Sequence, residues 1–322
     1  MAAGGSKKVV IAALVGNGMI AVTKFAASVY TGSSAMMSEG IHSLVDTCNQ
    51  ALLLYGIHRS NRPADDRHPF GYAREIYFWA FVVAILIFAV GAGVSIYEGV
   101  QKFLAPTPVH NAFVNYIVLG LAFVFEAGAW WMAFREFTRN KGSLGYLEAV
   151  RRSKDPALFT VLFEDTAAML GIVVAFVGIW LGQVTGLIWM DGAASIIIGI
   201  ILAVVAALLA YECKGLLVGE GASDDVVKSI HTLIEDHSAD TTVNEFLTMQ
   251  LGPNDVLVTI SLDFAGNITA GDVERHVSEM ESKIKSAHPD VKRVFIEAQS
   301  FAAHTRQVAA MEQPKEPEKP EE

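Results

Sequence analysis

Six long apolar runs constrain the fold of this 322-residue chain more than any other feature of its sequence. About 20 apolar helical residues cross the hydrocarbon core of a bilayer, and every run is longer than that. A content of 52% hydrophobic residues, gathered in such runs, is typical of a membrane protein. The runs are 8–30, 34–58, 76–99, 112–134, 157–182 and 188–210. We therefore expect a six-helix transmembrane bundle, all α-helical, in residues 1–211.

Basic residues are concentrated in alternate loops, which predicts the orientation of the bundle. The loops after the second and fourth runs hold Arg59, Arg62, Arg67, Arg74, Arg135, Arg139, Lys141, Arg151, Arg152 and Lys154. The opposite loops hold Lys102 alone. Because basic loops stay in the cytoplasm, we expect both termini there. Lys7 and Lys8 precede the first run as in a signal peptide, but no cleavage site is clear, so we expect the run to remain as a membrane anchor.

After about residue 212 the sequence changes to the pattern of a small α+β domain. "DDVVKSIHTLIED" has helical periodicity, whereas "VNEFLTMQL" and "DVLVTISLDF" alternate like strands around the turn "GPND". Thr269 is a candidate N-cap of a second helix, and "VKRVFIEAQ" is a last strand. The order predicts a cytosolic αββαβ domain, ferredoxin-like, in residues 212–302. The Pro-rich, charged segment 303–322 is predicted to be disordered.

Charge and cysteine content exclude some classes of protein. Residues 1–211 are nearly neutral, whereas residues 212–302 carry a net charge of about −9, so nucleic-acid binding is not expected. The two cysteines, Cys48 and Cys213, do not support a disulfide scaffold.

The second apolar run contains four polar residues on one helical face. Glu39, His42, Asp46 and Asn49 are separated by three, four and three residues. Ionisable groups inside a membrane span are costly and usually mark a substrate path.

The fifth run carries a second acidic group at a similar depth. Asp165 lies roughly 14 Å along the helix from Pro156, and Asp46 lies roughly 18 Å from His58, at about 1.5 Å per residue. The carboxylates therefore meet if the two helices pack together. Imidazole and carboxylate ligands suit zinc, and also manganese, iron or cobalt. The alternative is a hydrogen-bonded clamp between helices that holds no ion.

Three further polar residues lie within the predicted spans. Lys24 is either a counter-ion or a side chain that snorkels to the interface. Glu126 is either a proton relay or a structural partner of Lys24. Asp191 stands at the start of the last run, where a helix-capping role is expected.

The motifs "SSAMMSEGIHSLVDTCNQ", "RPADDRHPFGYAREIYFWA", "FEDTAAMLGI" and "DGAASIIIGIIL" resemble those of the cation diffusion facilitators. The segment "HPFGYAREIYFWA" is similar to the corresponding segment in the branch of the family that includes an animal mitochondrial zinc exporter. The resemblance covers about residues 8 to 300. It implies a homodimeric, six-span, proton-coupled exporter of divalent metals with a tetrahedral site between spans two and five.

The resemblance implies His42, Asp46 and Asp165 as metal ligands. The family's span-five histidine falls on Val161, which cannot bind a metal. Glu164 is the nearest replacement, although it points about 100° away from Asp165 on an ideal helix; a water or Asn49 are other candidates. A loop site of some members matches Asp65 and His68, but the second histidine is Tyr72, so we expect this segment to shape the loop.

Together these observations predict a secondary active transporter, not an enzyme, in a bacterial inner membrane or an organelle membrane. Its substrates are protons and a divalent metal, with zinc first and manganese or iron as alternatives, and no cofactor is bound permanently. A non-transporting metal sensor or scaffold remains a second hypothesis, since one family ligand is missing. An intramembrane metalloenzyme is a third, but no HExxH motif occurs.

Overall fold

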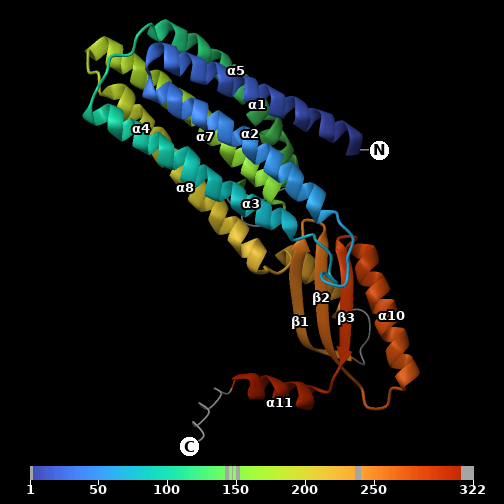
Figure 1. Ribbon diagram of the computed structural model, residues 1–322. Helices are drawn as coiled ribbons and strands as arrows, with labels where there is room; N and C mark the ends of the chain where they lie inside the picture. The colour runs from blue at the N-terminus through green and yellow to red at the C-terminus, as the bar shows by residue number, and fades with distance from the viewer. Residues whose placement is uncertain (1–2, 142–144, 147, 150–152, 236–240, 313–322) are drawn as a thin grey trace, which may run out of the picture. The chain divides into compact units, whose positions relative to one another are not determined.

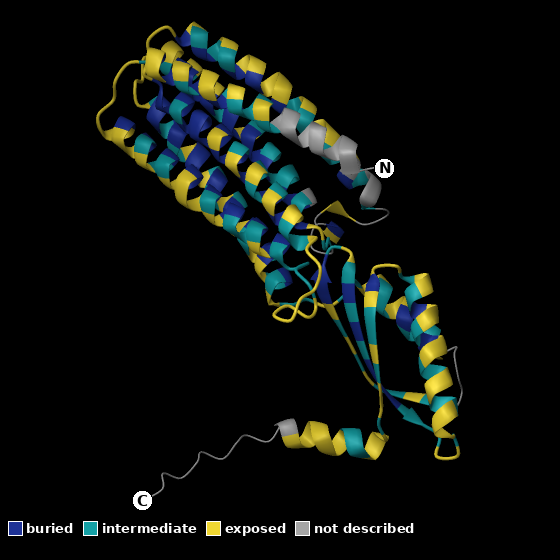
Figure 2. Ribbon diagram, turned by 45° about the vertical axis from the view of Figure 1, so that its right-hand side comes forward, coloured by how far each residue is buried: buried dark blue, intermediate teal, exposed yellow. Residues whose placement is uncertain are grey.

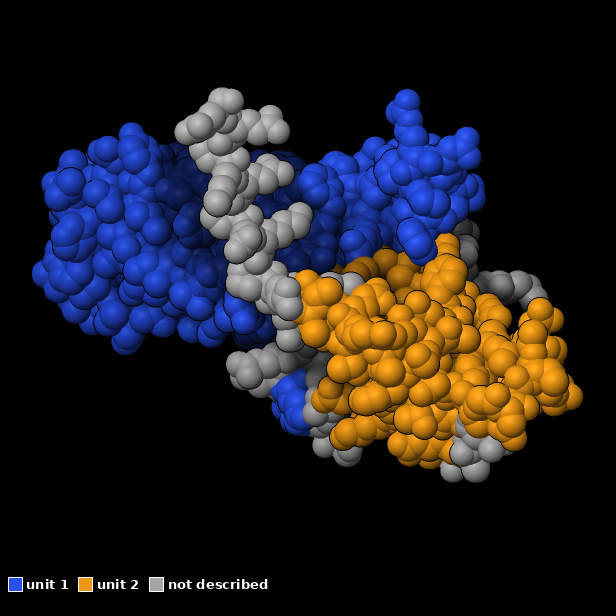
Figure 3. Space-filling view, turned by 90° about the horizontal axis from the view of Figure 1, so that it is seen from below, with its two compact units in different colours: residues 1–218 blue, residues 219–322 orange. Residues whose placement is uncertain are grey.

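The computed structural model describes residues 3–312 except 142–144, 147, 150–152 and 236–240. The chain forms two compact units, Met1–Val218 and Gly219–Glu322, coloured separately in Figure 3. The first unit is helical, and the second combines helices with a small sheet.

The helical unit is built from long helices that run alongside one another (Figure 1). Ile87–Ala92 form a π-helical turn, η1, that joins two of them into one continuous helix, Glu75–Leu104. The helices are α1 (Ala3–Thr31), α2 (Ser34–Ser60), α3 (Glu75–Leu86), α4 (Gly93–Leu104), α5 (Ala112–Asn140), α7 (Pro156–Thr185) and α8 (Met190–Val218).

Among the residues that the structure describes, four segments are long and apolar enough to cross a membrane. They are Glu75–Leu104, Ala112–Arg135, Phe159–Thr185 and Met190–Val218. The predicted spans 8–30 and 34–58 fall on α1 and α2, which are 29 and 27 residues long but do not reach the same hydropathy over their described residues. In α2 the reason is the polar face that carries His42 and Asp46. The number of six spans therefore stays a prediction.

Local sequence explains where the helices of the site begin. Ser33 caps α2 by accepting a hydrogen bond from the Met36 amide, and Gly32 before it takes a left-handed φ of 69°. Asp155 caps α7 in the same way, and Pro156 occupies the first helical position. These signals fix the registers of α2 and α7, and hence the depth of their polar residues.

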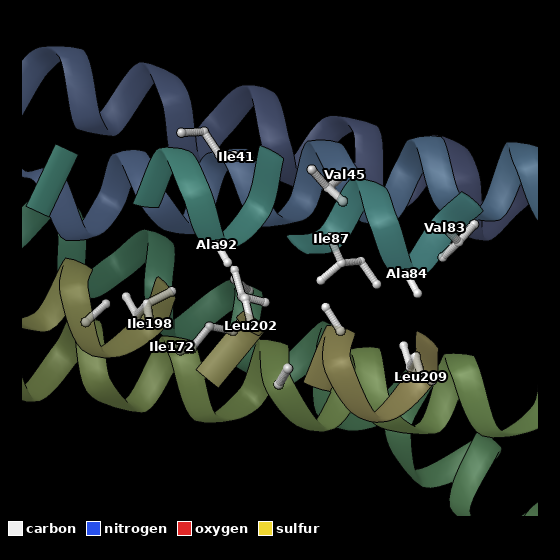
Figure 4. Packing of buried hydrophobic residues seen from close by; sticks show 14 of the residues in the cluster. Ile41, Val45, Val83, Ala84, Ile87, Ala92, Ile172, Ile198, Leu202 and Leu209 are labelled. Atoms are coloured by element: carbon white, nitrogen blue, oxygen red, sulfur yellow. The ribbon is translucent and has the colours of Figure 1, made fainter. Parts of the chain in front are cut away.

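Apolar side chains fill the space between the helices, and large apolar side chains also cover the outside. In Figure 4, Ala92 and Leu202 point toward one another from η1 and α8, and Val83 and Leu209 lie farther along the same pair of helices. Figure 2 shows that buried residues line the inner faces of the helices. Exposed side chains such as Phe113, Val124 and Trp131 give the outer surface the apolar character that lipid requires.

Glycines bring α4 and α8 into backbone contact. A Cβ at Gly192 would lie 2.7 Å from the Phe103 nitrogen and 2.9 Å from the Gly99 oxygen. A Cβ at Gly199 would lie 3.0 Å from the Ile96 nitrogen. Small residues at such crossings let membrane helices approach closely.

The second unit follows the predicted order of helix, two strands, helix and strand. These elements are α9 (Asp224–Glu235), β1 (Thr241–Gly252), β2 (Asp255–Phe264), α10 (Ala270–Ala287) and β3 (Val291–Ala298). The sheet order is β1-β2-β3, with β1 antiparallel and β3 parallel to β2. Thr269 caps α10 by accepting from the Asp272 amide, as predicted. The described residues supply three strands, so the ferredoxin-like topology stays a prediction.

The structure differs from the sequence prediction at the C-terminal end. Phe301–Glu312 form a helix, α11, where a disordered tail was expected from residue 303. Alanines and other good helix formers fill this stretch, and Ser300 accepts the first backbone hydrogen bonds, from Ala303 and His304. The Pro-rich remainder, 313–322, lies outside the described residues.

We expect Gly192→Ala to lower the free energy of unfolding by about 1–3 kcal/mol, because the added methyl group meets the backbone of α4. Thermal unfolding of the purified protein measures this loss. Gly128→Ala in α5 is the matched control, since a Cβ there has nothing within 4 Å. Equal unfolding temperatures for the two variants would contradict the close crossing of α4 and α8.

Candidate functional site

The polar face of α2 is buried inside the helical unit. Glu39 and Asn49 are fully buried, and His42 and Asp46 are 2% and 6% exposed. The spacing of these residues along the helix points all of them inward, while neighbours such as Leu44 and Cys48 are exposed. A helix that fits a membrane in length thus carries a charged stripe on its protein-facing side.

Helix α7 meets this face through Glu164. The Asn49 amide donates a hydrogen bond of 2.8 Å to the Glu164 carboxylate, which is 4% exposed. Asp165 is partly buried, and its Oδ2 has no hydrogen-bond partner. Glu164 and Asp165 are both close enough to Asp46 to interact with it electrostatically. Sequence reasoning gave Asp165 the main role, whereas the structure brings Glu164 into direct contact with α2.

Several side-chain oxygen and nitrogen atoms in this region, all of types that can bind a metal, have no hydrogen-bond partner. His42 Nε2 lies 3.5 Å from Asp46 Oδ2, too far for a good hydrogen bond. The buried side-chain atoms without a hydrogen bond on α2 and α7 include Glu39 Oε1, both ring nitrogens of His42, Asp46 Oδ1, Asn49 Oδ1 and Asp165 Oδ2. Buried polar atoms without partners are rare and costly, and imidazole and carboxylate are the usual ligands of divalent transition metals.

These donors are not gathered into a finished coordination shell. Over the residues that the structure describes, no group of three or more His, Cys, Asp or Glu side chains is arranged to hold a metal ion. The candidate ligands therefore lie on two neighbouring helices without surrounding a common point in this structure.

Lys24 acts as a counter-ion rather than snorkelling. Its side chain is fully buried, and Nζ lies 2.9 Å from Glu39 Oε2 and 2.8 Å from Ser43 Oγ. The alternative partner, Glu126, is buried on α5 and has no hydrogen bond or ion pair within the described part of the chain. Ser43 was missed at the level of sequence, although a small polar residue directly after His42 is a signal for such a contact.

Asp191 caps a helix, but not its own. Its carboxylate accepts hydrogen bonds from the Ser33 hydroxyl at 2.5 Å and from the Ser34 amide at 2.7 Å. Lys102 lies 3.9 Å from it and also binds the Gly32 carbonyl. The first turn of α8 thus holds the N-terminal end of α2, the helix with the candidate ligands.

The loop between α2 and α3 is organised by Asp65. Its carboxylate accepts hydrogen bonds from the His68 amide at 2.8 Å and from the Tyr72 hydroxyl at 2.6 Å. The residues that match a metal site of other proteins therefore shape the loop here, as the presence of Tyr72 suggested.

The match to known families covers most of the chain. The cation efflux transmembrane domain matches residues 10–218. The chain belongs to the cation efflux family. Membership and the long apolar helices make it an integral membrane protein.

Three relatives illustrate the similarity of this chain to curated proteins. The proton-coupled zinc antiporter SLC30A9, mitochondrial, of Homo sapiens is 35% identical over 266 residues, which are 82% of this chain and 47% of that protein. Metal tolerance protein C4 of Arabidopsis thaliana is 28% identical over 82% of this chain and 58% of its own length. The cation-efflux pump FieF of Shewanella oneidensis is 21% identical over 84% of this chain and 86% of its own length. The chain thus spans about half the length of the human relative.

We expect Tyr72→Phe to raise the pKa of Asp65 toward its usual value of 3.8. The Tyr72 hydroxyl, and after it the His68 amide, hold this pKa below its usual value by donating to the carboxylate. Because its pKa is lowered in the folded protein, the ionised Asp65 carboxylate stabilises the loop in full above the pKa of the unfolded chain. This stabilisation is lost as the pH falls through the lower pKa of the folded state. Carboxyl NMR of the purified protein measures the shift. Tyr211→Phe, in the exposed end of α8, is the control, and an Asp65 pKa that stays the same in Tyr72→Phe would contradict the role of Tyr72.

Proposed function

We propose that this chain exports divalent transition-metal cations, zinc first, in exchange for protons. The observation that carries the proposal is the set of unpartnered, buried imidazole and carboxylate atoms on α2 and α7 of a cation efflux domain. Similarity to a protein named as a proton-coupled zinc antiporter supports both the ion and the coupling.

In this proposal His42, Asp46 and Asp165 bind the metal, and Glu164 either joins them or positions Asn49. His42 and Asp46 lie one helical turn apart on α2, and both acids of α7 interact electrostatically with Asp46. In this proposal α7 moves relative to α2 until the donors surround one ion.

Exchange with protons follows from the chemistry of these ligands. A metal binds only the deprotonated forms of imidazole and carboxylate, so protons and metal compete for the same atoms. His42 is the natural coupling group because imidazole titrates near physiological pH. Rocking of the helices around a site of fixed position then exposes it to each side in turn.

The remaining features of the proposed transporter come from sequence patterns and family resemblance. We propose that α1 and α2 span the membrane with the four apolar segments, giving six spans in residues 1–211. Both termini lie in the cytoplasm, residues 212–302 form the domain through which two copies dimerise, and manganese or iron are the alternative substrates. The sensor or scaffold hypothesis keeps the metal site without net transport, and it finds support in Val161.

We expect Asp46→Ala and Asp165→Ala each to abolish zinc uptake into proteoliposomes driven by a pH gradient, because each removes a proposed ligand. Uptake is measured with a zinc-sensitive dye inside the vesicles. Asp66→Ala, in the exposed loop, is the control and retains uptake. Zinc transport at the wild-type rate by Asp46→Ala or Asp165→Ala would refute the proposed site. Zinc binding without zinc transport by the wild type would favour the sensor hypothesis.

We expect Val161→His to strengthen zinc binding relative to manganese by about tenfold, since it adds an imidazole one turn before Asp165. Competition with a chromophoric chelator measures both affinities on the purified protein. Val161→Leu controls for side-chain volume. If Val161→His leaves the zinc affinity at the value of Val161→Leu, then Asp165 does not face the bound ion.

A further inference from the structure

A fully buried lysine lies beside the proposed transport site. Lys24 on α1 forms two contacts with α2, to Glu39 Oε2 at 2.9 Å and to Ser43 Oγ at 2.8 Å. The two helices lie side by side along the unit (Figure 1). A lysine inside a membrane protein is costly unless it is paired, so its presence here calls for a role.

The charge of Lys24 acts on the proposed ligands. Glu39 precedes His42 by one turn of α2 and Asp46 by two, and Ser43 directly follows His42. Lys24 interacts electrostatically with both ligands, and the other charges acting on Asp46 are those of the carboxylates Glu126, Glu164 and Asp165. Among the described residues that act on Asp46, Lys24 is thus the positive charge within a group of acids.

Glu39 is a buried carboxylate that could bind a metal, but one of its oxygens is already paired with Lys24. One of its oxygens binds Lys24, and the other, Oε1, is buried and has no hydrogen-bond partner. Oε1 faces the bare backbone of α7, because a Cβ at Gly171 would overlap it. The carboxylate thus reaches α7 on the side of the helix pair that carries the ligands.

We propose that Lys24 is the built-in counter-ion of the transport site, which neutralises Glu39, keeps it out of the metal's coordination shell and thereby sets the metal affinity low enough for release. This inference rests on the proposed function. A site with an additional free carboxylate would hold a divalent cation more tightly and would favour ions that prefer oxygen ligands, such as manganese. The Lys24–Glu39 pair avoids both effects without removing either charge from the bundle.

A purely structural role makes a different prediction. If the pair only ties α1 to α2, then loss of either partner destabilises the protein and weakens metal binding in both cases. If Lys24 acts as a counter-ion, loss of the lysine and loss of the carboxylate change the affinity in opposite directions. The sign of the change therefore distinguishes the two roles.

The test measures zinc and manganese affinities of the purified full-length protein by chelator competition at pH 7.5. We expect Lys24→Met to bind zinc about tenfold more tightly and Glu39→Gln about tenfold more weakly, because each leaves one unbalanced charge near the ion. The double variant Lys24→Met/Glu39→Gln replaces an ion pair of zero net charge with two uncharged side chains. Its zinc affinity therefore returns to within about threefold of that of the wild type. In Lys24→Met the preference for zinc over manganese also falls.

Two controls accompany these variants. Lys24→Arg keeps the charge and should keep the affinity of the wild type. Lys102→Met removes another buried lysine, which binds the Gly32 carbonyl, and should leave zinc affinity unchanged. Size-exclusion chromatography and thermal unfolding identify variants that fail to fold; if Lys24→Met is among them, weaker binding by Glu39→Gln and recovery in the double variant carry the test.

Shifts in the same direction for the two single variants, or no recovery in the double variant, would overturn the counter-ion role. The proposed function fails separately, when the wild type binds no divalent cation or when Asp46→Ala binds zinc as the wild type does.

Discussion

A polar group buried among apolar helices must find a partner, and this requirement governs the helical unit. At one end of α2 the requirement is met, because Asp191 accepts from the Ser33 hydroxyl and the Ser34 amide. On α1 it is met for Lys24, whose Nζ donates to Glu39 Oε2 and Ser43 Oγ, although Glu39 Oε1 keeps no partner. Nearer the middle of α2 it is not met, since His42 and Asp46 keep atoms without partners. The contrast between satisfied and unsatisfied groups on the same helix distinguishes polar residues that hold the fold from those that are available to a ligand.

The satisfied contacts also explain how the unsatisfied ones stay in place. Helix α2 is attached to α8 at its first turn and to α1 through a buried ion pair. Helix α8 in turn packs against α4 through glycines whose backbones touch. The proposed ligands of α2 thus belong to a helix with several fixed points, whereas α7 contacts its polar face through the hydrogen bond between Asn49 and Glu164. Helix α7 is itself packed closely against α8, where a Cβ at Gly178 would overlap the Ala194 Cβ.

Sequence patterns predicted the elements well but not the partners of individual side chains. Apolar run length and helical spacing gave the helices of the site, and alternation gave β1 and β2, because these signals are local. The partner of Asp191 lies 157 residues away at Ser34, and that of Lys24 is Glu39 rather than Glu126; such pairs depend on how helices pack. Glu164 illustrates the same limit, since an ideal helical wheel turned it away from α2. Helix α11 was missed because the charged, Pro-rich sequence after it dominated the composition of the tail.

The π-helical turn at Ile87–Ala92 determines which residues the long helix Glu75–Leu104 presents to α8. Through α3 and into the first residue of the turn, the buried positions Ile76, Ala80, Val83 and Ile87 follow the α-helical repeat. From Gly91, inside the turn, they continue at Ser95, Gly99 and Lys102 of α4, a series that lags the ordinary repeat by one residue. The wider π-helical turn accommodates this extra residue, so the buried face of the helix stays continuous from α3 to α4. Gly99 and Lys102 face inward because of this phase shift, and the contacts at the N-terminal end of α2 therefore depend on a local change of helical pitch two turns or more away.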